Sequence, residues 1–265
     1  MENFSFEFEK AQAEFIKSNA SEKSIENIYD IINFLKDIDE KNFEENYTLA
    51  CAYELIEENI YASNIIEKLL YNNFNEFETK KLSLLQEHIK SKNSWNKKTY
   101  RDLRDAKSVK IPTKLKLNDF IISNANDENK YRITLTNEIE SIVILNKNVK
   151  IEDLWLDDNN SVVFSNNNPT NSLLLKLIDY IEWIGDIKDE LLNFHNKLLL
   201  TEGELLYVGQ KWYDSLDIID FWIEVDDFEN FETHLILLDY LQNGYGFRLE
   251  IENRNIKSIE YDPNL

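Results

Sequence analysis

Apolar residues recur at three- and four-residue spacing through the first part of the chain, up to about residue 105. This spacing puts apolar side chains on one face of an α-helix and therefore predicts amphipathic helices. Five helices are expected, over about 8–16, 25–35, 43–58, 60–72 and 76–91. Because the connections between them are only a few residues long, neighbouring helices should run antiparallel. The pattern predicts a helical bundle or a short solenoid.

From Val109 the period changes, and short apolar or alternating runs predict β-strands separated by polar stretches such as 124–129. This β region ends at Pro169, where a long helix is expected over about 172–200, with Gly203 beyond its end and Gly185 as a candidate break. The strands of the β region are expected around 110–117, 131–135, 141–145, 149–151, 154–156 and 162–164.

The last part of the chain returns to strands, which are expected at 215–225, 233–241, 247–252 and 256–261. Asn243-Gly244 is a strong hairpin-turn pattern, and Asn253-Arg-Asn255 is a weaker one. Strands joined by such tight turns form an antiparallel meander. The fold class predicted is α+β, an N-terminal antiparallel helical bundle followed by a mixed module of antiparallel β-strands and one long helix. The domains expected are 1–105, helical and tetratricopeptide-like, and 106–265, an α+β domain with a C-terminal β-meander.

Charge narrows the classes of partner. The chain has 29 basic and 50 acidic side chains, a net charge of −21. Such a charge opposes binding to nucleic acid and to anionic lipid, and it attracts basic proteins. The excess is local, because residues 179–265 carry 20 acidic and 6 basic side chains, whereas residues 106–178 carry 9 of each. Residues 93–107 are basic and include Trp95 and Tyr100, and we expect them to be a solvated linker.

The scarcity of glycine, histidine and cysteine argues against several kinds of functional site. With 5 glycines and no GxGxxG or Walker pattern, a Gly-rich phosphate loop is not expected. His88, His195 and His234 are scattered, no zinc motif is present, and no catalytic residue, metal or cofactor is predicted. Cys51, the single cysteine, is expected to be buried apolar filler. The start of the chain lacks a signal-peptide pattern and no run of 18 apolar residues occurs, so we expect a cytoplasmic protein without a membrane anchor.

One helix pair resembles a tetratricopeptide repeat, in which small residues stand where two helices cross and larger ones where they interlock. The resemblance covers about 30 residues and implies a protein-interaction scaffold. Its positions are Leu49, Ala50 and Tyr53 on the first helix and Ala62, Ile66 and Leu69 on the second. A plain helical hairpin would account for the same spacing.

The segment 213–232 carries the candidate binding surface. On a strand, Asp220, Trp222, Glu224 and Asp226 would project to one face, and Phe221, Ile223 and Val225 to the other. Charge on such a face steers a basic protein and an aromatic side chain anchors it. The alternative is a solvated sheet face with Trp222 half-buried against the long helix. The partner-binding residues predicted are Asp217, Asp220, Trp222, Glu224, Asp226, Asp227, Glu229 and Glu232.

The C-terminal third, about 175–265, resembles a bacterial domain family of unknown function that pairs a Trp-bearing helix with an antiparallel sheet. The resemblance lies in 177–184 with Trp183, in the helix end at His195, in Trp212–Leu216, in 231–237 with His234, and in the final meander. Because that family is commonly encoded near polymorphic toxins, the resemblance implies a non-catalytic immunity-type protein that binds a basic toxin, possibly a nuclease. The alternatives are a helical-repeat scaffold and a hydrolase with an acidic metal site.

Overall fold

The computed structural model describes residues 4–71, 74–91, 100–124, 130–151, 163–198, 207–241 and 245–262. The chain divides into two compact units, residues 1–105 and 106–265, at the boundary that the change of period also marks in the sequence. Parts of the expected linker (92–99), the strand expected at 154–156 and the Asn243-Gly244 turn lie outside the described residues. Each unit is described by itself.

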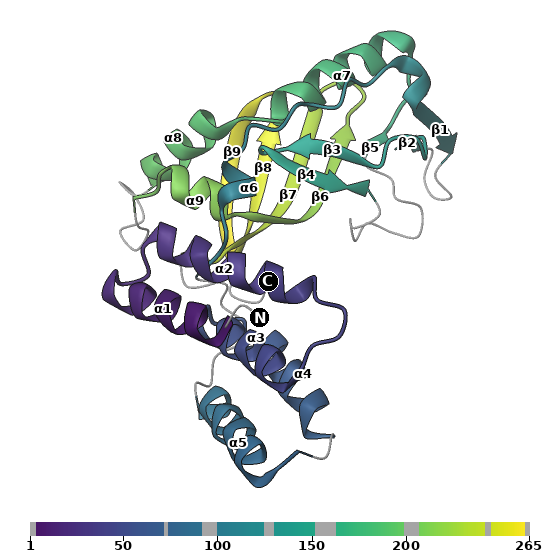
Figure 1. The fold of residues 1–265 in the computed structure, drawn as a ribbon. Helices are drawn as coiled ribbons and strands as arrows, with labels where there is room; N and C mark the ends of the chain where they lie inside the picture. Colours follow the sequence, from purple (N-terminus) through teal and green to yellow (C-terminus); the bar gives the residue numbers. More distant parts are fainter. Residues whose placement is uncertain are drawn as a thin grey trace. The chain divides into compact units, whose positions relative to one another are not determined.

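The first unit is made of helices that pack in succession (Figure 1). α1 packs on α2 and α3, α2 also packs on α3, and α5 packs on both α3 and α4. In the pair α3 and α4, Ala50 and Ala62 are fully buried where the helices meet, beside Ile66 and Leu69. The bounds are α1 (Phe4–Lys17), α2 (Glu22–Lys36), α3 (Phe43–Leu55), α4 (Asn59–Leu70) and α5 (Glu76–Ser91).

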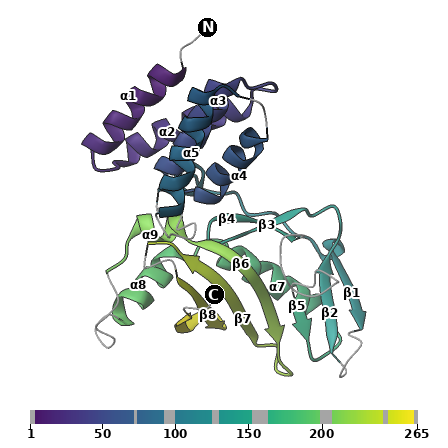
Figure 2. The ribbon, with the colours of Figure 1, turned by 90° about the horizontal axis from the view of Figure 1, so that it is seen from below.

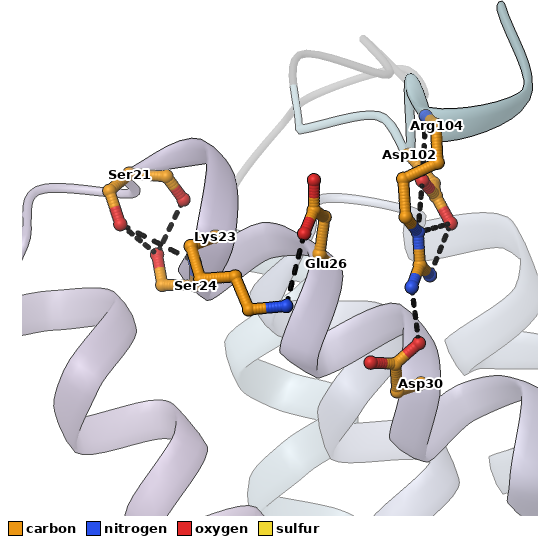
Figure 3. A network of polar contacts seen from close by, with 7 residues as sticks. All are labelled: Ser21, Lys23, Ser24, Glu26, Asp30, Asp102 and Arg104. Carbon is orange, nitrogen blue, oxygen red and sulfur yellow. Dashed lines mark hydrogen bonds and ion pairs between the residues drawn. The ribbon is translucent and has the colours of Figure 1, made fainter. Parts of the chain in front are cut away.

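Short polar side chains determine where these helices begin. The Ser21 hydroxyl accepts a hydrogen bond from the Ser24 N–H and caps α2, as Figure 3 shows. At α3, Asn42 Oδ1 accepts from the Glu45 N–H at 3.0 Å while the Glu45 carboxylate accepts from the Asn42 N–H at 2.8 Å. Such reciprocal capping satisfies two backbone donors that the first turn leaves without partners.

The end of the first unit is fastened to α2. The Arg104 guanidinium bridges the carboxylates of Asp102 and Asp30, each at 2.6 Å (Figure 3). The Tyr29 hydroxyl donates to the Tyr100 carbonyl at 3.0 Å, and the Tyr100 ring meets Phe15 edge-on. The part of the expected linker that the structure describes is therefore held against helices. A short helix, α6 (Arg104–Lys107), follows it.

The second unit is built on a sheet whose described strands run in the order β1-β2-β5-β6-β7-β8-β9, with a separate β3–β4 hairpin. All pairs are antiparallel except β5 and β6, which are parallel. The bounds are η1 (Leu117–Asp119), β1 (Phe120–Asn124), β2 (Tyr131–Leu135), β3 (Ser141–Ile144), β4 (Lys147–Lys150), β5 (Val163–Ser165), α7 (Asn171–Ile184), α8 (Lys188–Leu198), α9 (Gln210–Ser215), β6 (Asp217–Val225), β7 (Phe231–Asp239), β8 (Tyr245–Glu252) and β9 (Asn255–Asp262). The expected α+β class is confirmed.

The long helix expected over 172–200 is two helices, α7 and α8, broken at Gly185. The β3–β4 hairpin explains the break, because the Leu145 N–H donates to the Ile184 carbonyl and the Asn146 N–H to the Gly185 carbonyl. A Cβ at position 185 would stand 3.3 Å from the Val143 carbonyl oxygen, so glycine permits this close approach.

The chain has only 5 glycines, and asparagine occupies positions with positive φ in two of its tight turns. Asn146 in the β3–β4 turn and Asn253 in the β8–β9 turn have φ values of 56° and 46°. This left-handed region is more accessible to Asn than to most other side chains. The weaker turn pattern at Asn253-Arg-Asn255 therefore marks a real hairpin.

The core of the second unit lies between the sheet and its helices. α7 and α8 pack on one face of the sheet, and Figure 2 shows α7 behind β6. Buried aromatic and aliphatic residues of the strands, such as Phe221, Leu235 and Phe247, meet Leu177, Tyr180 and other residues of α7. Among the described residues, no helix has the length and apolar character needed to cross a membrane.

Candidate functional site

The strands β6–β9 separate apolar from polar side chains across the sheet. Phe221, Leu235, Leu249 and Ile259 occupy one cross-strand row, and all four are buried against the helices. The next row, on the opposite face, holds Trp222, His234, Glu250 and Ser258, which are partly exposed. The predicted alternation along 220–225 is therefore present, with Phe221, Ile223 and Val225 in the core.

Carboxylates from all four strands lie on this second face, which we call the acidic face. Directly paired residues of an antiparallel sheet project to the same side, so the register alone assigns them. The carboxylates are those of Asp217, Asp220, Glu224, Glu232, Glu250, Glu252, Glu260 and Asp262. The last two strands thus add four acids to the four that β6 and the start of β7 supply.

Three glutamates, Glu224, Glu232 and Glu252, stand side by side on β6, β7 and β8. Like charges directly opposite one another destabilise a sheet. Lys257 offsets part of this repulsion, because its Nζ lies 2.6 Å from Glu252 Oε2. Glu224 has no ion pair or hydrogen bond through its side chain with any residue that the structure describes.

The Trp222 indole stacks on the His234 imidazole, with ring centroids 4.8 Å apart and ring planes 19° from parallel. The imidazole lies between two carboxylates, with Nε2 3.6 Å from Glu232 and Nδ1 4.0 Å from Glu250. Glu250 also accepts a hydrogen bond from the Ser258 hydroxyl at 3.0 Å. The alternative interpretation placed Trp222 against the long helix, but Trp222 lies on the opposite face of the sheet. There its indole and the His234 ring form an aromatic pair next to Glu232 and Glu250, which we call the Trp222 platform.

Asp220 lies on the acidic face but is nearly buried, with 8 % of its surface exposed. Asp220 pairs with Ile236 in the same register as Trp222 with His234, and a β-bulge separates it from Ile218. Burial raises the pKa of the Asp220 carboxyl above its ordinary value, although the hydrogen bond from the Phe221 N–H acts in the opposite direction. Asp220 is therefore a desolvated carboxylate beside the Trp222 platform.

Three of the predicted residues lie in the β6–β7 turn instead of on the strand face. Asp226 accepts hydrogen bonds from the N–H groups of Phe228 and Asn230 and from the Asn230 side chain. These bonds lower the pKa of the Asp226 carboxyl. Glu229 pairs with Lys176 at 2.6 Å, while Asp227 is exposed. Asp226 and Glu229 are occupied within the protein, so they are less available to a partner than the sequence suggested.

The helix-covered face also carries polar groups, and they bond to one another. Asp239 is fully buried and accepts from the Trp212 indole N–H at 2.6 Å, from the Tyr261 hydroxyl at 2.9 Å and from the Leu241 N–H. His195 Nε2 lies 3.1 Å from the Tyr261 oxygen. Burial lowers the pKa of His195 despite the nearby Asp239. The network links α8 and α9 to β7 and β9.

The other residues that the sequence offered as metal ligands or nucleophiles lie far apart from one another in the chain. His88 Nε2 lies 3.1 Å from a Glu54 oxygen in the helical unit. Burial raises the pKa of the Cys51 thiol to about 11, so the thiol is protonated. Among the described residues, no group of three or more His, Cys, Asp or Glu side chains is arranged to hold a metal ion. A hollow of about 840 Å³ between β1–β2 and β3–β4 contains none of the predicted site residues.

Comparisons with protein-family models, with curated proteins and with solved structures find no match to this chain.

Proposed function

We propose that the protein is a non-catalytic immunity-type protein that binds and neutralises a basic toxin through its acidic face. The observation that carries this proposal is the gathering of eight carboxylates on one side of β6–β9. Negative potential concentrated on one surface steers a cationic protein toward it and raises the association rate. A toxin that acts on nucleic acid carries the complementary charge, because its cleft must attract phosphate.

The arrangement of the acids favours a binding role over simple solubility. The Glu224–Glu232–Glu252 row places like charges opposite one another, which costs stability, and Asp220 adds a carboxylate that burial disfavours. Solubility needs neither feature, since acids scattered over the surface would serve it equally well. A cationic partner would offset both costs.

We also propose that the protein acts in the cytoplasm of the bacterium that produces it. A single cysteine cannot form an internal disulfide, and in that reducing compartment it stays a thiol. An immunity protein acting there would occupy its toxin before the toxin reaches the cell's own nucleic acid.

A second candidate function is favoured by the helical unit, in which each helix packs on its successors as in a repeat scaffold. In that case residues of α1–α5 would contact the partner and the sheet would be structural. If the acidic face binds the partner, removing its charges should abolish binding. If the helical unit binds the partner, only changes in α1–α5 should abolish it.

The decisive experiment uses the full chain and a basic toxin encoded by a neighbouring gene, with growth rescue and affinity at several salt concentrations as measurements. The triple variant Asp220→Asn, Glu224→Gln, Glu232→Gln should lose growth rescue and weaken binding by roughly 100-fold, since a charged contact contributes about 1–3 kcal/mol. It should also flatten the salt dependence.

The matched control is Glu9→Gln, Glu14→Gln, Glu67→Gln, which removes the same net charge from exposed sites on α1 and α4. This control should change affinity only slightly. If the control loses binding and the sheet variant keeps it, the helical scaffold replaces the acidic face as the binding unit.

A further inference from the structure

The two edge strands of the described sheet differ in how they are protected from pairing with another chain. β9 carries Lys257, Glu260 and Asp262, and its register with β8 shifts between Glu250 and Ile251. Charged side chains and irregular register are features that keep an edge strand from adding a further strand. β1 contains no charged residue and no proline, and its pairing with β2 is continuous over all five residues. β1 therefore has the properties of an edge that is open to pairing.

Each face of β1 exposes an isoleucine. Ile121 is 49 % exposed and Ile122 is 40 % exposed, and neighbouring residues of a strand project to opposite faces. On the helix-covered side, Ile122 continues a cross-strand row of buried residues, which are Ile133, Val163 and Ile223. Figure 2 shows β1 at one end of the sheet, and no described strand pairs with its outer edge. A strand added there would cover both isoleucines and extend the buried row.

The distribution of charge favours a second copy of this chain as the occupant of this edge. Residues 106–178, which include β1, carry 9 acidic and 9 basic side chains, whereas residues 179–265 carry 20 acidic and 6 basic ones. Two copies that approached through their acidic strands would repel each other, but a neutral edge repels no second copy and attracts no basic protein. Two-fold dimers are also the commonest homo-oligomers, because one self-complementary surface is enough to form them.

We propose that two copies of the protein dimerise by antiparallel pairing of their β1 strands. A two-fold axis perpendicular to the sheet and next to Ile122 pairs all five residues of β1, with the two Ile122 side chains opposite each other. This axis keeps the helix-covered faces of both copies on the same side, so the buried row of Ile122 and Ile133 continues from one copy into the other. The inference goes beyond the proposed function and does not depend on it.

The test measures the mass of the full protein by analytical ultracentrifugation at increasing protein concentration. The wild type should move from the monomer mass toward twice that mass. Raising the salt from about 0.05 M to about 0.5 M should strengthen the dimer, because it screens the repulsion between two acidic copies. Ile122→Lys and Ile122→Glu should each stay monomeric, since like charges would face each other across the axis. An equimolar mixture of these two variants should dimerise again, because opposite charges then meet.

The matched control is Ile111→Lys, the same substitution at a residue of the same unit that is 85 % exposed. It should dimerise like the wild type, and circular dichroism should show that all three variants keep the native fold. A wild type that stays monomeric at every concentration overturns the inference, and so does a dimer that persists in both Ile122 variants. Because β1 carries none of the predicted binding residues, neither outcome bears on the acidic face.

Discussion

The two faces of β6–β9 handle polar groups in opposite ways. On the helix-covered face, Asp239 is surrounded by donors from Trp212, Tyr261 and Leu241. On the acidic face, Asp220 accepts one backbone bond, and three glutamates stand next to each other. The first arrangement stabilises the fold, because the Trp212 indole N–H and the Tyr261 hydroxyl donate to an acceptor in a dry environment. The second places like charges next to one another, which is unfavourable in the isolated protein and agrees with the binding role that we propose.

The largest difference between the faces should come from Asp239→Ala. The substitution leaves the Trp212 N–H and the Tyr261 hydroxyl without their acceptor, which should lower the free energy of unfolding by about 3–5 kcal/mol. Urea unfolding followed by circular dichroism measures the loss. Asp227→Ala, at an exposed turn position, should change it by less than about 0.5 kcal/mol. A small effect of Asp239→Ala would mean that this network does not stabilise the core.

Acid should weaken the helix-covered face through His195. Burial makes the folded-state pKa of His195 lower than the unfolded value of about 6.5, so the unfolded state binds more protons once the pH falls through that value. The stability that neutral His195 provides is thus present above pH 6.5 and declines below it, by at most about 1.4 kcal/mol per pH unit. Urea midpoints at pH 7.5 and 5.5 measure the decline.

Two histidine variants isolate this effect. His195→Gln should be less stable at pH 7.5 and should lose the pH-dependent step, whereas His234→Gln on the acidic face should retain it. A step that persists in His195→Gln would assign the titration to another group.

On the acidic face, Asp220→Asn should make the free protein more stable, by roughly 1 kcal/mol. The raised pKa of Asp220 means that burial disfavours its carboxylate, and this cost grows as the pH rises through the folded-state pKa. The amide keeps an oxygen for the Phe221 N–H and carries no charge. Thermal unfolding at pH 7.5 should show a higher midpoint, and the gain should disappear near pH 3. A lower midpoint at pH 7.5 would show that Asp220 supports the fold.

The smallest effect should come from Glu232→Gln, which removes the middle charge of the glutamate row. Stability should rise by about 0.2–1 kcal/mol at low salt, and the gain should shrink in 1 M salt, where the repulsion is screened. Glu182→Gln on α7 makes the same charge change on the helix-covered side and should lack this salt dependence. If the stabilities of the two variants depend on salt to the same extent, like-charge repulsion is not specific to the acidic face.

Much of the fold followed from local pattern. Apolar residues at helical spacing located α1–α5 to within a few residues, and alternation in 220–225 separated the core side chains from the polar ones. Capping side chains such as Ser21 and Asn42 act through backbone groups three residues away. Local physics of this kind is visible in the sequence because the partners are close in the chain.

The candidate site was predicted only in part. Trp222 and Glu224 lie on the expected face, but Asp226 bonds to residues of its own turn and Glu229 pairs with Lys176 on α7. Glu250, Glu252, Glu260 and Asp262 were missed, although their alternation with Leu249, Ile251 and Ile259 was visible. Alternation shows that a strand has a polar side, but it does not show that four strands, β6–β9, present their polar sides on the same face of one sheet.

The sequence by itself determined the helical first unit, the polar and apolar sides of each strand, and the excess of acid in its last third. Only the tertiary structure decided that β5 pairs in parallel with β6, that a bulge in β6 puts Asp217 on the same face as Asp220, and that Trp222 stacks on His234. Register depends on contacts between residues far apart in the chain, and a shift of one residue would send every side chain to the other face.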